Sequence, residues 1–430
     1  MWGQETARPH NFLGDFMKIF DDAQKIIKTT IADNMPRHAV ENALRAHTFS
    51  GKIYLVAIGK AAWTMASTAA DFLGDRLEKG IVVTKYEHSQ GDLPRIDVYE
   101  AGHPLIDENT IAATQKCIEM VKKLGEGDEL LFLVSGGGSA LFEAPLEGVT
   151  LEDLQNVSSQ LLASGADIVE INMIRKRLSA VKAGRFAQLA APAKVFSVIL
   201  SDVLGDRLDS IASGPAVPDN STVEDAAKVA EKYNLNLTDL QRKYLTQETP
   251  KVIDNVTIAI TGSVRTLCES VAKAASELGY TPTILTTTMN CEASEAGRFL
   301  ASVAADTVAG RTSFTAPCAI IAGGETVVTL KGNGRGGRNQ EIALVAANGI
   351  AGLDNVLVFS LGSDGTDGPT DAAGGIVDGT TLSKLKANGY DIDKILANND
   401  SYNGLTAADG LIITGPTGTN VNDVTVILCR

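Results

Sequence analysis

The sequence predicts an α/β protein built from two domains. Its 430 residues exceed the usual size of a single domain. Aliphatic residues and glycine are abundant, whereas aromatic residues make up only 5 % of the chain. This balance is typical of helices packed on sheets rather than of a β-sandwich. Apolar runs that end in glycine, serine, threonine or an acid alternate with helical patterns, which is the order expected of βαβ units in a parallel sheet.

The elements follow one another in that order along the chain. Apolar residues recur at helical spacing over residues 12–27, which predicts an amphipathic helix at the start. A strand over residues 53–58 then ends at Gly59, and a helix is expected over residues 61–72. Further buried strands are expected over residues 81–84, 130–134, 195–200, 256–260, 319–322 and 356–361.

A polar stretch separates the two expected domains. Residues 234–255 contain Pro250 and little periodicity, so we place a boundary there and predict domains of residues 1–245 and 246–430. Residues 411–428 are rich in glycine and threonine between two apolar runs. This last stretch is expected to return a strand to the second domain.

Charge and composition exclude several classes of function. The net charge is −14 with no obvious basic patch, which disfavours binding to nucleic acid or to an anionic membrane. No apolar run is long enough to span a bilayer, and the first ten residues lack the core of a signal peptide. The five cysteines are dispersed and form no CxxC pair, which argues against a disulfide framework or a zinc site. We therefore expect a cytoplasmic protein, whose anionic ligands would need local positive charge.

The candidate chemistry lies where the strands end, because ligands of open α/β sheets bind beyond the carboxyl ends of the strands. The strand at residues 130–134 is followed by Ser135, Gly136, Gly137, Gly138 and Ser139. Bare backbone N–H groups of such a loop converge readily on an anion. The alternative is a tight turn in which only glycine fits and no ligand binds.

Basic side chains occur at one of these strand ends and in one further segment. Lys60 comes directly after a strand and a glycine, where its charge opposes the helix dipole unless an anion binds. A solvated lysine is the alternative. Residues 171–187 carry a cluster of basic side chains that do not share one helical face, so some of them are ordinary surface charges: Arg175, Lys176, Arg177, Lys182 and Arg185.

Acids also follow the predicted strands. Asp202 follows the strand at residues 195–200 and could hold magnesium or accept a proton, unless it only caps a helix. Asp364, Asp367 and Asp371 follow the strand at residues 356–361. Magnesium prefers one or two carboxylates together with phosphate oxygens and water, so this trio is interpreted as a metal site rather than a polar turn.

The segment at residues 323–344 is the most distinctive. Arg335 and Arg338 lie among glycines, and guanidinium groups bind phosphate or carboxylate in a bidentate manner, which favours an anion clamp. Gly332, Gly334 and Gly337 also spell the GxGxxG pattern of dinucleotide-binding proteins. Arginines within the loop fit phosphate transfer better, and the next acidic strand end, at Asp364, is farther away than the usual ~20 residues.

Taken together, these segments resemble the glycerate 2-kinase family, the class of glycerate kinases that contains a MOFRL region. The matching stretches come in family order and cover nearly the whole chain: "IGKAAWTMA", "LVSGGGSALFEAP", "INMIRKRLSAVKAGR", "SDVLGDRLDSIASGP", "GGETVVTLKGNGRGGRNQE", "SLGSDGTDGPTDAAGG" and "ITGPTGTNVNDV". The resemblance implies a Rossmann-like three-layer domain, a second α/β domain with the MOFRL region at about residues 318–428, and an active site in the cleft between them. It also implies ATP, D-glycerate and Mg²⁺ as ligands.

The resemblance also assigns roles to individual residues. Lys60 and Arg338 match family positions that act in catalysis, and the loop from Ser135 to Ser139 matches a ligand-binding loop. From these matches we expect the γ-phosphoryl group of ATP to pass to the 2-hydroxyl of D-glycerate. Asp202 would orient or deprotonate that hydroxyl, with Glu325 as its rival.

The remaining assignments complete the expected site. Arg175 or Lys176 would hold the glycerate carboxylate, and Asp364 and Asp367 would anchor Mg²⁺. Three further residues are assigned to substrate or phosphate binding: Asn172, Arg335 and Asn339.

Alternatives to this function stay open at this point. An NAD(P)H-dependent hydroxypyruvate reductase is the main one, and a sugar-acid sensor without catalysis is another. The choice of the 2-phosphate over the 3-phosphate rests on the resemblance alone, and homo-oligomer formation is left open.

Overall fold

The computed structural model describes residues 12–201, 205 and 208–430, with side chains from Lys18 onward. The described chain forms two compact units. The first unit is Pro36–Ser263, and the second unit joins the N-terminal helix α1 (Phe12–Asp33) to Val264–Arg430. We describe each unit by itself.

The first unit is built on a parallel sheet, as the sequence predicts. The strands are β1 (Lys52–Ile58), β2 (Leu77–Lys85), β3 (Ile96–Ala101), β4 (Asp128–Val134), β5 (Lys194–Leu200) and β6 (Val256–Gly262). Their order is β3-β2-β1-β4-β5-β6, the order of the dinucleotide-binding fold. Ile58 pairs with Val134, so the carboxyl ends of β1 and β4 lie side by side where the strand order reverses. Such a reversal is the usual ligand site of this fold.

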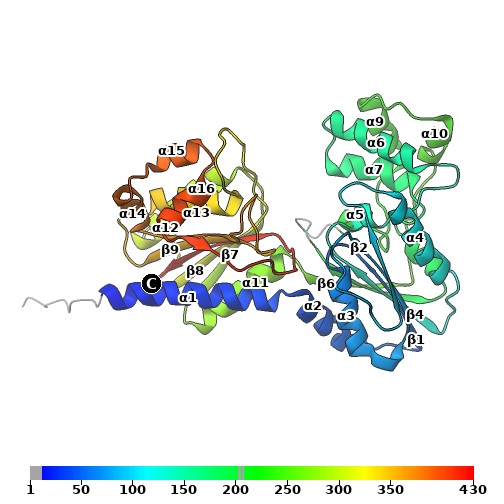
Figure 1. Ribbon diagram of the computed structural model, residues 1–430, viewed down its shortest axis with the longest axis horizontal. Helices are drawn as coiled ribbons and strands as arrows, with labels where there is room; N and C mark the ends of the chain where they lie inside the picture. The colour runs from blue at the N-terminus through cyan, green and yellow to red at the C-terminus, as the bar shows by residue number, and fades with distance from the viewer. Residues whose placement is uncertain (1–11, 202–204, 206–207) are drawn as a thin grey trace, which may run out of the picture. The chain divides into compact units, whose positions relative to one another are not determined.

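Helices cover both faces of this sheet (Figure 1). α2 (Pro36–Ala46) and α3 (Ala62–Leu73) share one apolar core with the sheet. α4 (Glu108–Val121) and α8 (Arg185–Ala190) share the core on the opposite face. Both faces are buried, which is why the strands read as continuous apolar runs. The predicted three-layer, Rossmann-like domain is confirmed.

A cluster of helices with its own apolar core extends the first unit. It contains α6 (Leu151–Ala163), α7 (Ile168–Leu178), α9 (Val223–Lys232) and α10 (Asp239–Leu245), and each of these begins with a capping box. A capping box satisfies free N–H groups of the first turn and fixes the start of a helix. Arg175 and Lys176 consequently lie in the last turn of α7, where cations are favoured by the helix dipole.

The second unit is an α/β domain, as expected, but its sheet is mixed, whereas the strand and helix order by itself favours parallel strands. The strands are β7 (Thr281–Met289), β8 (Cys318–Gly324), β9 (Val356–Gly362), β10 (Gly374–Asp378), β11 (Leu411–Ile412) and β12 (Asp423–Cys429), in the order β11-β10-β9-β12-β8-β7. β12 is the predicted returning strand, and it runs antiparallel between β8 and β9. β10 is antiparallel to β9, because residues 363–373 are too few to form a crossover helix.

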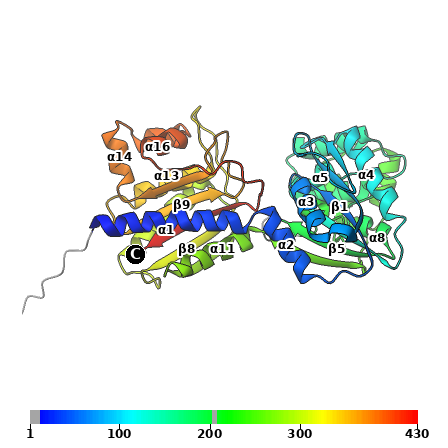
Figure 2. The same ribbon diagram turned by 60° about the horizontal axis from the view of Figure 1, so that its bottom comes forward.

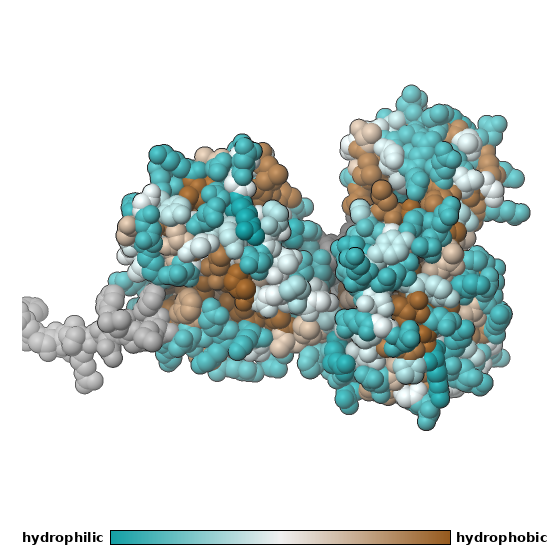
Figure 3. Space-filling view, viewed as in Figure 1, coloured by the Kyte–Doolittle hydropathy of each residue, from teal (hydrophilic) through white to brown (hydrophobic). Residues whose placement is uncertain are grey.

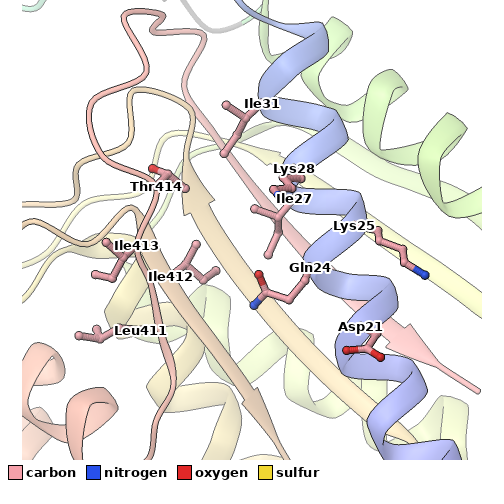
Figure 4. Close-up of a pocket in the computed structure, with 10 residues that line it drawn as sticks. All are labelled: Asp21, Gln24, Lys25, Ile27, Lys28, Ile31, Leu411, Ile412, Ile413 and Thr414. Carbon is pink, nitrogen blue, oxygen red and sulfur yellow. The ribbon is translucent and has the colours of Figure 1, made fainter.

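Helices also cover both faces of the second sheet (Figures 1 and 2). α1 and α11 (Val264–Glu277) lie on one face. On the other lie α12 (Ala293–Val308), α13 (Arg338–Gly349), α14 (Thr381–Ala387), α15 (Ile392–Ala397) and α16 (Ser401–Ala407). Asp22 of α1 accepts hydrogen bonds from Arg430 (2.6 Å) and from the Tyr280 hydroxyl (3.0 Å). A groove of about 720 Å³ separates α1 from residues 411–414, with Gln24 and Ile27 of the helix turned toward it (Figure 4).

The division between the units differs in position from the boundary expected at residues 245 and 246. It falls between Ser263 and Val264, and α1 belongs to the second unit. The physical reason lies in pairing and packing, because β6 pairs along β5 in the first sheet while α1 packs against α11.

The described chain has no membrane-spanning helix and no disulfide bond. No helix among the described residues has the length and apolarity needed to cross a membrane. Hydrophilic residues cover most of the face drawn in Figure 3. All five cysteines are free thiols, and only Cys291 is exposed.

Candidate active site

The ends of β1 and β4 are tied together by backbone and side-chain hydrogen bonds. The Lys60 N–H donates to the Gly136 carbonyl (2.9 Å), and the Ser135 N–H donates to the Ile58 carbonyl (3.0 Å). The Ser135 hydroxyl accepts from the Ala61 N–H and donates to the Ile58 carbonyl, both at 3.1 Å. Ser135 is buried, so it braces the two strand ends rather than presenting its hydroxyl to a ligand.

The glycines after Ser135 are required by close packing. Gly137 has a φ of +84°, and a Cβ there would lie 3.0 Å from the His103 ring and 3.3 Å from Lys60 Cε. A Cβ on Gly138 would lie 2.8 Å from the Ala212 Cβ. The helix that follows, α5 (Gly138–Leu141), is a single turn and adds little dipole. Packing therefore explains Gly137 and Gly138, and the loop places the Gly137 backbone directly beside the Lys60 side chain.

Positive charge collects at this end of the first sheet. Among the described residues, the Lys60 ammonium has no hydrogen-bond or ion-pair partner. Burial lowers the pKa of His103, and the nearby charges of Lys60, Lys85 and His88 lower it further. Lys85 and His103 were not predicted as site residues from the sequence, although Lys85 ends β2 and His103 follows β3 by two residues. This end of the sheet therefore attracts anions.

Two further cations bind the backbone of the loop at Ser139. Arg175 Nη2 (3.1 Å) and Lys182 Nζ (2.9 Å) both donate to the Ser139 carbonyl. They share the buried carboxylate of Glu143, at 4.0 Å from Arg175 and 3.4 Å from Lys182. Burial is the main cause that lowers the pKa of Lys182 to about 8. These contacts fix the Ser139 carbonyl toward the interior, so Lys182 and Glu143 position the loop.

The other predicted residues of the first unit differ in their surroundings. Asn172 joins the loop through Ser213, whose hydroxyl donates to Asn172 Oδ1 (3.0 Å) and contacts the Ser139 hydroxyl (2.9 Å). Lys176 does not join it, because it is buried and paired with Asp219 at 3.2 Å. The predicted base Asp202 lies outside the described residues.

Arg338 begins α13 and lies between two carboxylates. It donates to Asp423 through Nε (2.6 Å) and Nη2 (3.2 Å), and to Glu325 through Nη1 (2.9 Å). Asp423 pairs in register with Gly324 of β8 and Gly362 of β9, which places it at the carboxyl ends of both strands. Burial raises the pKa of Asp423 to about 6, although Arg338 opposes that shift. Asp423 was not predicted as a site residue from the sequence. The only indication was its position as the first residue of a largely apolar strand at the end of the sequence.

Asp367 caps α13 and is therefore a poor direct ligand for magnesium. Its carboxylate accepts the N–H groups of Asn339 (3.2 Å) and Gln340 (2.9 Å) and the side-chain amides of both residues. The start of α13 thus already holds an anion, which is the protein's own carboxylate. Burial raises the pKa of Asp367.

Asp364 fits a metal ligand better. It is partly exposed, and Oδ1 accepts the Thr366 N–H at 3.0 Å. A Cβ on Gly362 would lie 3.3 Å from Asp364 Oδ1 and 3.4 Å from Asp423 Oδ1, so these two carboxylates flank the same glycine. The described side chains contain no group of three or more metal-binding residues. Magnesium needs only one or two carboxylates when phosphate oxygens complete its shell.

Arg335 contacts a different set of residues from Arg338. Its guanidinium stacks over the Tyr402 ring at 4.3 Å and faces Asp371 at 3.8 Å. Asp371 also accepts the Tyr402 hydroxyl at 2.7 Å. The two arginines of the loop therefore do not form one clamp in this structure.

The GxGxxG pattern is explained without a dinucleotide. Cβ atoms on Gly332 and Gly334 would lie about 2.5 Å from backbone atoms of Asn398, and one on Gly337 would lie 2.3 Å from Asp367 Cγ. These glycines allow the loop to pack on its neighbours. The loop also separates β8 from α13 by residues 325–337, unlike the tight strand-to-helix turn of a dinucleotide fold.

Known proteins match the chain over nearly its whole length. The model of a domain of unknown function, DUF4147, matches residues 22–246, and the MOFRL family model matches residues 318–423. The D-glycerate 2-kinase of Thermotoga maritima is 53 % identical over 94 % of this chain and 97 % of its own. The glycerate 2-kinase of Pyrococcus horikoshii is 41 % identical over 96 % of this chain and 98 % of its own.

A solved structure and a differently named relative complete the comparison. The crystal structure of glycerate kinase from Thermotoga maritima superposes with a TM-score of 0.94 at 52 % identity, covering 96 % of this chain and all of that one. A relative in Agrobacterium vitis, 39 % identical over 94 % of this chain and 93 % of its own, carries a hydroxypyruvate reductase name that is itself provisional. Identity, coverage and fold agree with the motifs, and the chain belongs to the glycerate 2-kinase family.

Proposed function

We propose that the protein transfers the γ-phosphoryl group of ATP to the 2-hydroxyl of D-glycerate. The observation that carries this proposal is the Lys60 ammonium, which lies beside the Gly137 backbone without a counter-ion in the described chain. Phosphoryl transfer depends on positioning and on neutralising charge, and an unpaired cation beside bare backbone suits both tasks. The names of the relatives support D-glycerate as the acceptor.

Four of the predicted residues are assigned roles in this reaction. Lys60 and Arg338 would stabilise the charge on the transferred group. Arg175, which donates to the Ser139 carbonyl, would also bind the glycerate carboxylate. Glu325 is the acid that orients or deprotonates the hydroxyl, with Asp202 as the other candidate.

Magnesium fits the acidic surroundings of Arg338. The site contains one guanidinium and three carboxylates, those of Asp423, Glu325 and Asp364. A divalent cation would balance this excess of negative charge. Asp364 would hold the ion, and Asp367 would act indirectly by fixing the start of α13. When bound, magnesium neutralises charge on the phosphates of ATP.

A product assay tests the proposal. The protein is incubated with D-glycerate, ATP and Mg²⁺, and phosphorus NMR identifies the product. We expect 2-phosphoglycerate. Formation of 3-phosphoglycerate would correct the position of transfer, and the absence of any phosphorylated glycerate would refute the kinase. Oxidation of NADH by added hydroxypyruvate would support the reductase instead.

A further inference from the structure

The second unit contains a cavity of about 820 Å³ behind the glycine-rich loop. This volume is within the range of ~300–1,000 Å³ that is typical of small-molecule sites. Its lining includes Thr326 and Leu330, glycines of the loop from Gly332 to Gly337, and Arg338 and Asp364. The cavity is therefore lined by apolar, polar and charged groups together.

Part of the cavity wall is apolar. Val327 and Leu330 are 53 % and 79 % exposed, and Val328 lines the same wall. Exposed apolar side chains in a cavity favour a ligand with an apolar face. D-glycerate has no such face, whereas a nucleobase has two.

Two buried polar side chains also line the cavity, and one of them lacks a hydrogen-bond partner in the described structure. The side chain of Thr326 is only 2 % exposed, and its hydroxyl has no hydrogen-bond partner within the described structure. Glu341 is 7 % exposed, and it accepts a long bond of 3.5 Å from Asn399 Nδ2. Burial raises the pKa of Glu341. Because buried polar groups are nearly always hydrogen-bonded, these two side chains suit a ligand that carries hydroxyl groups.

The same cavity also reaches the proposed phosphoryl site, since Arg338 and Asp364 line it. We propose that this cavity binds the nucleoside part of ATP. The base lies against Val327, Val328 and Leu330, the sugar hydroxyls face Thr326 and Glu341, and the phosphates extend toward Arg338 and Asp364. This inference rests on the proposed function, because it names the place where that reaction's nucleotide binds.

The apolar wall is tested with Leu330→Ser, and Phe299→Ser is the matched control. Phe299 is 64 % exposed on α12 and is absent from the cavity lining. Calorimetry measures the binding of ADP and, separately, of inorganic tripolyphosphate. We expect Leu330→Ser to bind ADP about tenfold more weakly, because the base loses an apolar contact. Binding of tripolyphosphate and the KM for D-glycerate should stay unchanged, while the KM for ATP rises.

Thr326→Val separates binding from folding. The substitution removes a hydroxyl that has no partner in the protein, so the Tm without ligand should not fall. The affinity for ADP should fall several-fold, because the sugar loses a hydrogen-bonding group. A lower Tm with unchanged ADP affinity would show that the hydroxyl is structural and would overturn its assignment.

The two proposals fail in different ways. Equal ADP affinities in wild type, Leu330→Ser and Thr326→Val would overturn the nucleoside site while leaving glycerate phosphorylation intact. A wild-type protein that phosphorylates no glycerate would overturn the proposed function. In that case the ADP measurements still decide whether this cavity binds a nucleotide.

Discussion

The two glycine-rich loops look alike in sequence and differ in charge. The loop after β4 lies beside Lys60, which has no counter-ion in the described chain. Arg175 and Lys182 donate hydrogen bonds to the Ser139 carbonyl of this loop. The loop before α13 leads to Arg338, which is already paired with Asp423 and Glu325. The first loop can attract an anion by itself, whereas the second is surrounded by acids.

This difference shows that a glycine-rich strand end does not by itself define an anion site. What matters is whether the nearby cations and the helix start are already neutralised by the protein. Asp367 occupies the start of α13, so that helix has no free N-terminal charge to offer. The comparison can be tested by removing each charge in turn.

Lys60→Ala should have the largest effect on the rate. If Lys60 neutralises the transferred phosphoryl group, kcat should fall by about three powers of ten, as for the loss of an arginine finger. The Tm should stay unchanged, because the ammonium has no partner in the described structure. Lys116→Ala, on the exposed surface of α4, is the control. Near-normal turnover in Lys60→Ala would remove its catalytic role.

Arg338→Ala should lower both the rate and the stability. It leaves Asp423 buried without its partner, which costs about 3 kcal/mol of unfolding free energy. The pKa of Asp423 is raised, so ionising it costs stability as the pH rises through that pKa. The deficit relative to wild type should therefore be larger at pH 7 than at pH 5, as urea unfolding would show. An equal deficit at both pH values would contradict the pairing.

Asp364→Asn and Asp367→Asn should affect different properties. Asp364→Asn removes a charged ligand, so the Mg²⁺ concentration at half-maximal rate should rise about tenfold. Asp367→Asn weakens the cap of α13, so the stability should fall by about 1 kcal/mol. A metal titration and thermal unfolding of both variants provide the test. A raised Mg²⁺ requirement in Asp367→Asn alone would reverse the assignment.

Gly137→Ala and Gly352→Ala form a matched pair with φ values of +84° and +76°. Each costs about 1 kcal/mol of stability from backbone strain. Nothing lies within 4 Å of a Cβ on Gly352, whereas one on Gly137 meets His103 and Lys60. We expect kcat/KM to fall about tenfold in Gly137→Ala alone, by analogy with the large cost of misplacing a catalytic group. Equal activity in both variants would mean that the loop does not position Lys60.

Lys182 should give a smaller, pH-dependent effect. Its ammonium loses its proton near pH 8, which weakens its bonds to the Ser139 and Phe142 carbonyls. We expect kcat/KM to decline several-fold above pH 8, and the decline to be absent in Lys182→Met. The folded-state pKa is below the ordinary value of 10.5, so deprotonation does not cost folding stability. A Tm that falls in parallel with activity would point to unfolding instead.

Much of the fold could be predicted because buried strands leave a pattern that is local in the sequence. Apolar runs buried on both faces are continuous in sequence, so β1, β4, β5, β8 and β9 were all located from their composition. Glycine and serine directly after an apolar run likewise marked the strand ends that carry Lys60 and the loop from Ser135 to Ser139. The antiparallel course of β12 was missed, because a strand's direction depends on how its connection crosses the sheet.

The sequence by itself determined which residues could carry charge and at which strand ends they lie. Only the tertiary structure decided which of those charges are neutralised. Lys176 was one of two candidates to hold the glycerate carboxylate, but it pairs with Asp219. Arg338 pairs with Asp423, which lies near the end of the sequence. Ion pairs depend on distance in space, and strand register brings together partners that no sequence spacing connects.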